Sequence, residues 1–191
     1  MTPELKQFIA GYADIANDEL DEIAGKFKAK AIKKNEFLLQ QGEICKDLIF
    51  VQSGCLRLYY IADSIEVSVW FSFKHSSAIE LYSFISESPS NYYLQAIEDC
   101  EILFLPKPAL NNLYETHPKM QEMMRKFWED VVINLIDRFT ALQRDSAEKR
   151  YLDLLKKPPY IQNIPQKYLA SFIGVTPTSL SRIRKQIAKS N

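Results

Sequence analysis

The sequence has little glycine, few histidines and no excess of either charge, and each shortage removes a class of function. Glycine occurs only five times in 191 residues, which argues against a glycine-rich loop that cradles phosphate groups. No apolar stretch reaches the roughly 18 to 20 residues that span a bilayer. The GxSxG, HExxH and P-loop motifs are missing, and there are only two histidines, so no catalytic constellation stands out. We therefore expect neither an enzyme nor a membrane-bound protein.

The cysteines and the N-terminus predict a reducing compartment. The three cysteines, at positions 45, 55 and 100, form an odd set without a CxxC pair. This pattern favours reduced thiols over disulfides or a metal site. The first residues, Met1-Thr2-Pro3-Glu4-Leu5-Lys6, lack the basic-then-apolar order of a signal peptide. With 47% apolar and 25% charged residues, the composition is typical of a globular protein. We expect a cytoplasmic location.

The formal net charge is zero, but the charge is unevenly distributed along the chain. The stretch from Ser146 to Asn191 has nine basic and only two acidic residues, and the rest of the chain carries the compensating negative charge. An acidic body joined to a basic tail suggests two domains with different partners. The alternative is a charged surface that is merely solvated, but nucleic acid is the partner that such a cationic surface attracts most directly.

Short strands are predicted between about residues 29 and 105. Side chains alternate in Cys55–Ala62 and in Ile65–Phe71, and Asp63-Ser64 is a plausible tight hairpin turn between them. Tyr92–Ile97 and Cys100–Leu105 are further predicted strands. Many short strands at regular spacing favour an antiparallel sandwich or barrel.

Helices are predicted on both sides of these strands. Thr2-Pro3-Glu4 is typical of a helix start, and Asn17 is predicted to cap a second helix. After Pro106, helical periodicity continues from residue 107 to about residue 157, with a break at Pro118.

The long helix after Pro118 carries two apolar stripes. We expect one stripe to cover the barrel and the other to meet a partner helix as in a coiled coil, although both could belong to the core of a single chain. The residues predicted to form this dimer helix are Phe127, Trp128, Val131, Val132, Leu135, Phe139 and Leu142.

Residues 164–185 have the pattern of a helix-turn-helix. Pro165 begins the first helix, and Gly174 follows it at the position where a sharp turn needs a positive φ. Thr176 is predicted to cap the second helix, and Pro177 takes its first position. Leu180 and two isoleucines then give this second helix one apolar face.

The outer face of the second helix is predicted to contact double-stranded DNA. A major groove admits one helix, whose N-terminal half reaches the base edges. The guanidinium of Arg182 can bind O6 and N7 of a guanine together, and the lysines would neutralise phosphates. The predicted DNA-binding residues are Gln166, Lys167, Thr176, Thr178, Ser179, Arg182, Arg184, Lys185 and Lys189. The alternative is a small helical bundle with a charged face.

Nearly the whole chain resembles the Crp/Fnr family of bacterial transcription regulators. Segments 37–43 and 48–58 are similar to a cyclic-nucleotide-binding-like β-roll, and the long helix and the helix-turn-helix follow. The resemblance implies an α+β fold: an N-terminal antiparallel double-stranded β-helix, or jelly roll, over residues 1–117, a dimerisation helix over 118–145, and a helix-turn-helix domain over 146–191 that is winged-helix-like with a reduced wing. It also implies a homodimer that binds a two-fold symmetric operator and contacts RNA polymerase.

The family's nucleotide cassette is altered in this chain. Its Gly-Glu-Leu and Arg-Ser-Ala triplets fall on Ile79-Glu80-Leu81 and Ser90-Asn91-Tyr92. The family's ribose-binding acid is retained at Glu80, but serine replaces the arginine that pairs with the cyclic phosphate, and isoleucine replaces the glycine. An anion would lack its guanidinium partner and a close backbone approach. We therefore expect no cAMP binding of the usual kind, with these six residues as candidates for the pocket of an unknown small effector.

Several alternatives remain open for the sensor. Glu80 could be only a satisfied polar residue, and the chain could still respond to a cyclic nucleotide. It could also act mainly through protein contacts, with a cavity near Tyr59, Trp70, Tyr82 or Tyr93 for an apolar ligand. The clustered cysteines of an iron–sulfur sensor are missing, and His75 and His117 are the only candidates for a haem ligand. We expect no metal and no cofactor.

Overall fold

The computed structural model describes residues 3–190, which divide into two compact units. The first unit takes its residues from Met1–Leu58 and Phe71–Val132, and the second from Tyr59–Trp70 and Ile133–Asn191. The second unit thus includes the tip of a hairpin from the middle of the sequence. The predicted boundaries at residues 117 and 145 remain a prediction.

Two four-stranded antiparallel sheets form the body of the first unit. One sheet has the order β1-β8-β3-β6, and the other has the order β2-β7-β4-β5. The first comprises β1 (Lys28–Ile32), β8 (Cys100–Pro106), β3 (Asp47–Ser53) and β6 (Ser76–Ala78). The second comprises β2 (Phe37–Leu39), β7 (Tyr93–Ala96), β4 (Cys55–Ala62) and β5 (Ile65–Phe73). This arrangement confirms the predicted jelly roll.

Register explains which side chains fill the roll. Residues directly opposite each other in an antiparallel pair share a face, and Ile32 pairs with Cys100 while Val51 pairs with Ile102. All four are buried and belong to the main apolar core. Strands β1 and β3 both pair with β8, which lies about 50 to 75 residues later in the sequence. The roll is therefore held by long-range pairing rather than by consecutive hairpins alone.

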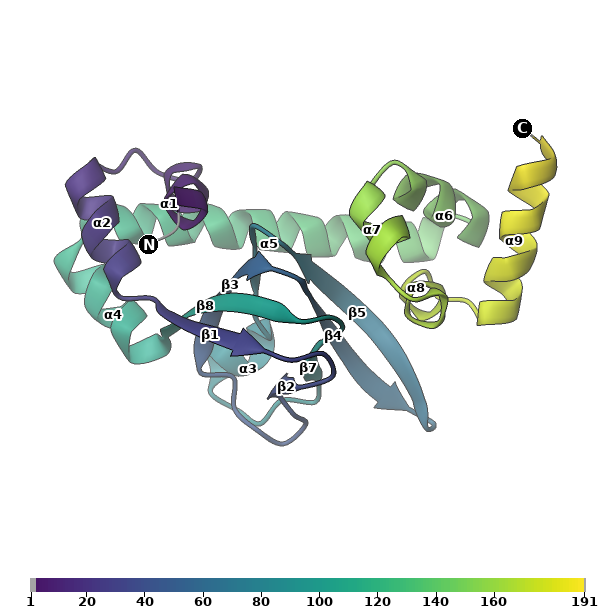
Figure 1. The fold of residues 1–191 in the computed structure, drawn as a ribbon, viewed down its shortest axis with the longest axis horizontal. Coiled ribbons are helices and arrows are strands. Elements are labelled where there is room, and N and C mark those ends of the chain that lie inside the picture. The colour runs from purple at the N-terminus through teal and green to yellow at the C-terminus, as the bar shows by residue number, and fades with distance from the viewer. Residues whose placement is uncertain (1–2, 191) are drawn as a thin grey trace. The chain divides into compact units, whose positions relative to one another are not determined.

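In the described part of the chain, four helices of the first unit precede or follow the strands in sequence, and a fifth, α3, lies between β6 and β7 (Figure 1). They are α1 (Pro3–Ala10), α2 (Asn17–Gly25), α3 (Leu81–Ser86), α4 (Lys107–Thr116) and the first part of α5 (Pro118–Arg144). The Phe8 ring lies 5.4 Å from that of Phe50 and 6.1 Å from that of Phe127, centre to centre, which fixes α1 against β3 and α5. The break predicted at Pro118 is confirmed.

The starts of the first two helices differ in part from the prediction. Asn17 was predicted as an N-cap, but it is the first residue of α2, and Ala16 holds the cap position without a side-chain hydrogen bond. The acidic residues that follow still lie in the first turn, where the helix dipole favours them. Thr2 lies outside the described residues.

The hairpin between β4 and β5 is formed as predicted. Asp63 and Ser64 both have positive φ, at 49° and 63°, as the tight turn of a two-residue hairpin requires. The strand β5 extends two residues beyond the predicted end, to Phe73.

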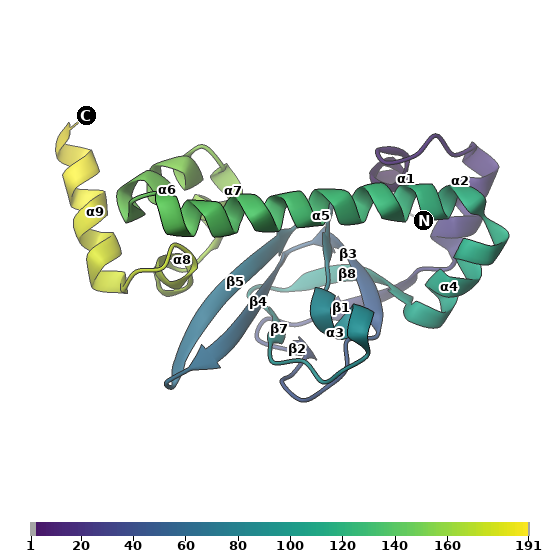
Figure 2. The same cartoon turned by 180° about the vertical axis from the view of Figure 1, so that it is seen from behind.

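The second unit is helical apart from that hairpin tip (Figure 2). Helix α5 ends at Arg144, so the helical pattern that was predicted to run on to residue 157 is interrupted there. Ser146 caps the next helix by accepting a hydrogen bond from Lys149 N at 3.2 Å. The helices that follow are α6 (Ala147–Leu155), α7 (Pro158–Asn163), α8 (Gln166–Phe172) and α9 (Pro177–Ser190). Among the described residues α7 therefore occupies the stretch in which a wing hairpin could have preceded α8.

Candidate functional site

Helices α8 and α9 meet at a sharp turn centred on Gly174. Its φ is +74°, which confirms the predicted left-handed glycine. Gly174 N donates to Ser171 O at 3.1 Å, and Val175 N donates to Ala170 O at 3.0 Å, so the end of α8 is closed by backbone hydrogen bonds. The glycine thus lets the chain reverse within one turn and start α9.

The start of α9 is fixed by Thr176 and Pro177, as predicted. Ser179 N donates to the Thr176 hydroxyl at 3.2 Å, which satisfies one of the free N–H groups of the first turn. Leu180 then packs, fully buried, on the α8 side of the helix. Together these residues fix the direction of α9 relative to α8.

One face of α9 is left to solvent. Thr178, Arg182, Lys185 and Lys189 are all exposed and recur at helical spacing. Among the described residues, none of these four side chains makes a hydrogen bond or an ion pair. Ser179 differs, because it is half-buried and its hydroxyl accepts a hydrogen bond from the Thr176 hydroxyl at 3.0 Å. The face therefore presents three cationic groups that no other part of the unit neutralises.

Three other predicted DNA-contact residues are engaged inside the second unit. Arg184 Nε donates to the Tyr151 hydroxyl at 2.9 Å, and its guanidinium lies over the same ring. Gln166 Nε2 donates to Ser181 Oγ at 2.7 Å, which ties α8 to α9. Lys167 Nζ lies 3.7 Å from Glu66 Oε2 in the hairpin tip. Of these, only Lys167 stays exposed enough to reach a ligand readily.

Two arginines that the sequence did not single out hold the turn in place. Arg138 Nη2 donates to Phe172 O at 2.9 Å, and its guanidinium carbon lies 3.6 Å from the centre of the Phe172 ring. Arg150 Nε donates to Ile173 O at 2.9 Å. Both therefore satisfy carbonyls at the end of α8. Burial lowers the pKa of Arg138 to about 10, so it remains a cation at neutral pH.

The hairpin tip also contacts α8. Ser68 N donates to Ser171 Oγ at 3.1 Å, and the two serine hydroxyls lie 2.9 Å apart. Ser68 is buried against this helix.

The six predicted pocket residues surround the short helix α3. Glu80 is 3% exposed, and its carboxylate accepts hydrogen bonds from Tyr82 N at 3.1 Å and from Ser83 N at 3.0 Å. Glu80 is thus the N-cap of α3. Ile79 and Leu81, on either side of it, are partly buried.

Ser90 is likewise engaged by its own neighbourhood. It is 2% exposed, and its hydroxyl accepts from Tyr92 N at 3.0 Å. Its backbone N–H donates to Glu43 O and its carbonyl accepts from Gly42 N, both at 2.8 Å. Asn91 points to solvent, and Tyr92 is half-buried. The two key cassette positions therefore hold local backbone structure and present no cation.

Helix α5 changes from buried to exposed along its length. Met120, Met124 and Phe127 are buried in the first unit, and Trp128 packs against Phe84 with ring centres 6.4 Å apart. The apolar side chains that follow are 39 to 61% exposed, and the set is Val132, Ile133, Leu135, Ile136, Phe139 and Leu142. The sequence prediction named four of these six and missed Ile133 and Ile136. One predicted stripe therefore covers the roll, and the other is uncovered in a single chain.

The thiols and the remaining side chains show no reactive cluster. Cys45, Cys55 and Cys100 are free and buried, and burial raises the pKa of each thiol, that of Cys100 to about 11. Within the described residues, no group of three metal-binding side chains is close enough to hold an ion. No helix among them is both long and apolar enough to cross a membrane.

Comparison with known proteins identifies a domain family that matches the roll and relatives that match most of the chain. Residues 29–117 match the cyclic nucleotide-binding domain family. Electron transport regulator A of Shewanella oneidensis is 20% identical, over 91% of this chain and 73% of that protein. The fumarate and nitrate reduction regulatory protein of Yersinia pestis is also 20% identical, over the same shares of the two chains.

A solved structure gives the same result for the fold. FixK2 from Bradyrhizobium japonicum superposes with a TM-score of 0.73 at 14% identity, covering 86% of this chain and 85% of that one. At this identity the likeness concerns the fold alone. Residues 29–117 therefore belong to the cyclic nucleotide-binding domain family, and the chain as a whole, in which this roll is joined to a helix-turn-helix, is similar to regulators of the Crp/Fnr type.

Proposed function

We propose that two copies of this chain bind a two-fold symmetric duplex, with one α9 in each of two neighbouring major grooves. The observation that carries this proposal is the outer face of α9, where Arg182, Lys185 and Lys189 lie exposed and unneutralised beside Thr178. A duplex is the partner whose charge and groove width match one cationic helix. The relatives favour this function over a sensor that acts mainly through protein contacts.

The residues of this face take different parts in the proposed complex. Arg182 lies in the N-terminal half of α9, where a helix reaches base edges, and it reads a guanine. Lys185, Lys189 and Lys167 bind phosphates, with Thr178 as a short neutral contact. We assign Arg184, Gln166 and Thr176 to support of the helix pair, because the side chain of each is bound within the unit.

Pairing through α5 supplies the second recognition helix. Six apolar side chains exposed along one helix are more than a single soluble chain normally leaves open, and their spacing suits helix–helix packing. The dimer places the two α9 helices about one helical turn apart, roughly 34 Å, on symmetric half-sites. Contact with RNA polymerase and a cytoplasmic location belong to the same proposal.

The cassette in this proposal does not bind cAMP in the usual way. Glu80 already accepts two backbone hydrogen bonds, and Ser90 offers no positive charge for a cyclic phosphate. A titration with cAMP that is followed by thermal unfolding checks this point. Added cAMP should leave the melting temperature unchanged, and a saturable increase would contradict the assignment.

Substitution of Arg182 tests the DNA-reading face directly. The binding free energy is measured for duplexes that the native chain selects from a random pool and for scrambled duplexes. In Arg182→Ala the difference between these two free energies should fall by about 1 to 3 kcal/mol. Lys185→Ala should weaken binding to all duplexes alike and lower the salt slope by about one. The matched control is Lys157→Ala, which removes one exposed charge at the start of α7. Unchanged discrimination in Arg182→Ala would overturn the assignment of this arginine.

A further inference from the structure

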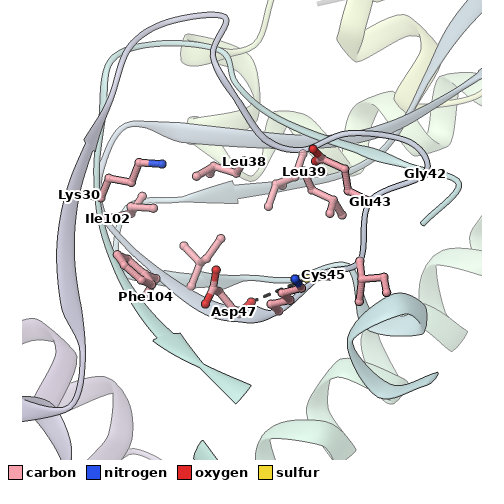
Figure 3. Close-up of a pocket in the computed structure, with 13 residues that line it drawn as sticks. Lys30, Leu38, Leu39, Gly42, Glu43, Cys45, Asp47, Ile102 and Phe104 are labelled. Atoms are coloured by element: carbon pink, nitrogen blue, oxygen red, sulfur yellow. Dashed lines mark hydrogen bonds between the residues drawn. The ribbon is translucent and has the colours of Figure 1, made fainter. Parts of the chain in front are cut away.

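A cavity that opens to solvent lies between the two sheets of the roll, and the cassette residues do not line it. Its volume is about 610 Å³, which lies within the range of small-molecule pockets. Its walls come from β1, β3 and β8 of one sheet, from β2 and β7 of the other, and from the loop at residues 42–46 (Figure 3). Neither Glu80 nor Ser90 borders it. The cavity therefore needs an explanation of its own.

Most of the wall is apolar. The side chains that give it this character are Leu38, Leu39, Ile49, Leu94, Ile102 and Phe104. Pairing across the sheet places Ile102 opposite Lys30 and Phe104 opposite Ile49, and directly opposed residues share a face. Lys30 therefore lies on the face of β1 that borders the cavity, as Lys28 and Ile32 do, and of these three only Ile32 is buried. The Lys30 amine thus stands at the solvent-exposed rim of an otherwise apolar wall.

Two amines, of Lys30 and Lys46, and two carboxylates, of Glu43 and Asp47, line the cavity, and the amine of Lys28 is close enough to act on Asp47. Burial raises the pKa of the half-buried Asp47, and the positive charges of these three lysines oppose that rise. Figure 3 shows the ammonium of Lys30 pointing toward Leu38 and the Asp47 carboxylate facing the same space. The other acid of the wall, Glu43, is committed to its turn, since its carboxylate accepts from Gln40 N at 2.7 Å. Within the described residues, the amines of Lys28, Lys30 and Lys46 form no hydrogen bond or ion pair.

We propose that this cavity binds an amphipathic carboxylate, with an apolar acyl or aryl body inside the roll and its anionic group held by Lys30 and Lys46. An apolar wall of this extent favours a ligand without polar groups along its length, because each would be left without a partner. Three amines, of Lys28, Lys30 and Lys46, against the two carboxylates of the wall favour a single negative charge on that ligand. This inference concerns the sensor domain and stands independently of DNA binding.

Decanoate is the probe that tests the proposal on the full chain. Equilibrium dialysis with labelled decanoate, below the concentration at which it aggregates, should give saturable binding of one molecule per chain. Acetate, which has the charge alone, and decyltrimethylammonium, which has the chain with the opposite charge, should fail to compete. A Lys30→Gln, Lys46→Gln double variant should bind about tenfold more weakly. Lys26→Gln, which removes an exposed charge away from the cavity, should bind normally.

A second variant keeps the test decisive if the lysine on β1 is needed for solubility. β1 lies at the edge of its sheet. A charged residue at such an edge can have the sole function of preventing association between chains. Lys46→Gln alters the loop instead and should also weaken decanoate binding. The proposal is overturned if the native chain shows no saturable binding, if decyltrimethylammonium competes equally, or if Lys46→Gln binds decanoate as tightly as the native chain.

Discussion

At the residue scale, Glu80 keeps the acid of a nucleotide cassette while its carboxylate caps a helix. The carboxylate is buried and receives two backbone N–H groups from the first turn of α3. About half of its acceptor sites are therefore taken by the protein itself. Ser90 likewise supports the loop at Glu43 through its backbone. The sequence showed the loss of the arginine, but it could not show that both positions are occupied by local hydrogen bonds.

Gly174 is the residue whose backbone conformation the proposed reading face depends on most. A Cβ added here would meet only ordinary contacts, the nearest being Leu142 Cδ2 at 3.6 Å, so the cost of alanine lies in the backbone. We expect Gly174→Ala to destabilise the second unit by about 1 to 2 kcal/mol, because its φ of +74° is unfavourable for a residue with a Cβ. Urea denaturation measures the change.

Asparagine provides the control for Gly174. It tolerates the left-handed region better than alanine, so Gly174→Asn should recover part of the lost stability. Equal stability of Gly174→Ala and the native chain would show that the turn relaxes to another conformation.

Asp145 predicts how stability depends on pH. Arg144 Nε and Lys149 Nζ donate to its carboxylate at 2.9 and 3.0 Å, and these hydrogen bonds lower its pKa to about 2. The folded state therefore holds this proton less tightly than the unfolded state, whose pKa is about 3.9. The resulting stabilisation is complete above about pH 4 and decreases as the pH falls toward 2.

Comparison of Asp145→Asn with the native chain tests this assignment. The variant should be less stable at pH 6, and the difference in the free energy of unfolding should narrow as the pH is lowered to 3. Asp14→Asn, at an exposed carboxylate of the first unit, should show no such narrowing. A constant difference between Asp145→Asn and the native chain across this range would contradict the assigned ion pairs.

At the scale of elements, the sequence predicted those whose signal is local. The strand β4 and its turn at Asp63-Ser64 were found because a run of strand-forming residues ends at a short turn, although both faces of β4 are buried over its first three residues. Helices α8 and α9 were found because glycine, threonine and proline mark the turn between them. The helix α3 was missed, since six residues are too few for a periodic pattern and glutamate is not a common N-cap.

The supporting contacts of the site could not have been predicted in the same way. Arg138 and Arg150 bind carbonyls that lie 34 and 23 residues later in the chain. No local sequence pattern predicts a hydrogen bond over such a separation. Arg184 was predicted to bind DNA phosphate because it is basic and lies in the second helix. The ring of Tyr151 draws it inward instead, which a helical wheel of α9 alone does not show.

The exposed half of α5 predicts the behaviour of the chain in solution. Ile136 is 57% exposed, so Ile136→Asp removes little packing within a single chain but buries a charge in a helix–helix interface. We expect this variant to sediment as a monomer with unchanged helical content, and to lose high-affinity binding to symmetric DNA. Ile136→Val keeps an apolar side chain and should remain a dimer. A dimeric Ile136→Asp would place the interface elsewhere.

At the scale of the whole molecule, the division of charge follows the division of function. The basic residues gather in the last quarter of the sequence, within the unit that contains α8 and α9, while the roll holds the cassette and the lysine-lined cavity. Because the hairpin tip at residues 59–70 clusters with the helical unit, the strands β4 and β5 belong to both units. They connect the roll covalently to the hairpin tip, which is hydrogen-bonded to α8 through Ser68 and Ser171.

A chemical footprint of the native chain on a duplex that it has selected from a random pool tests the central claim most directly. If two copies place paired α9 helices in neighbouring major grooves, the footprint consists of two symmetric patches whose centres lie about 34 Å apart on one side of the duplex. A single patch, or no protection at low salt, would contradict the account.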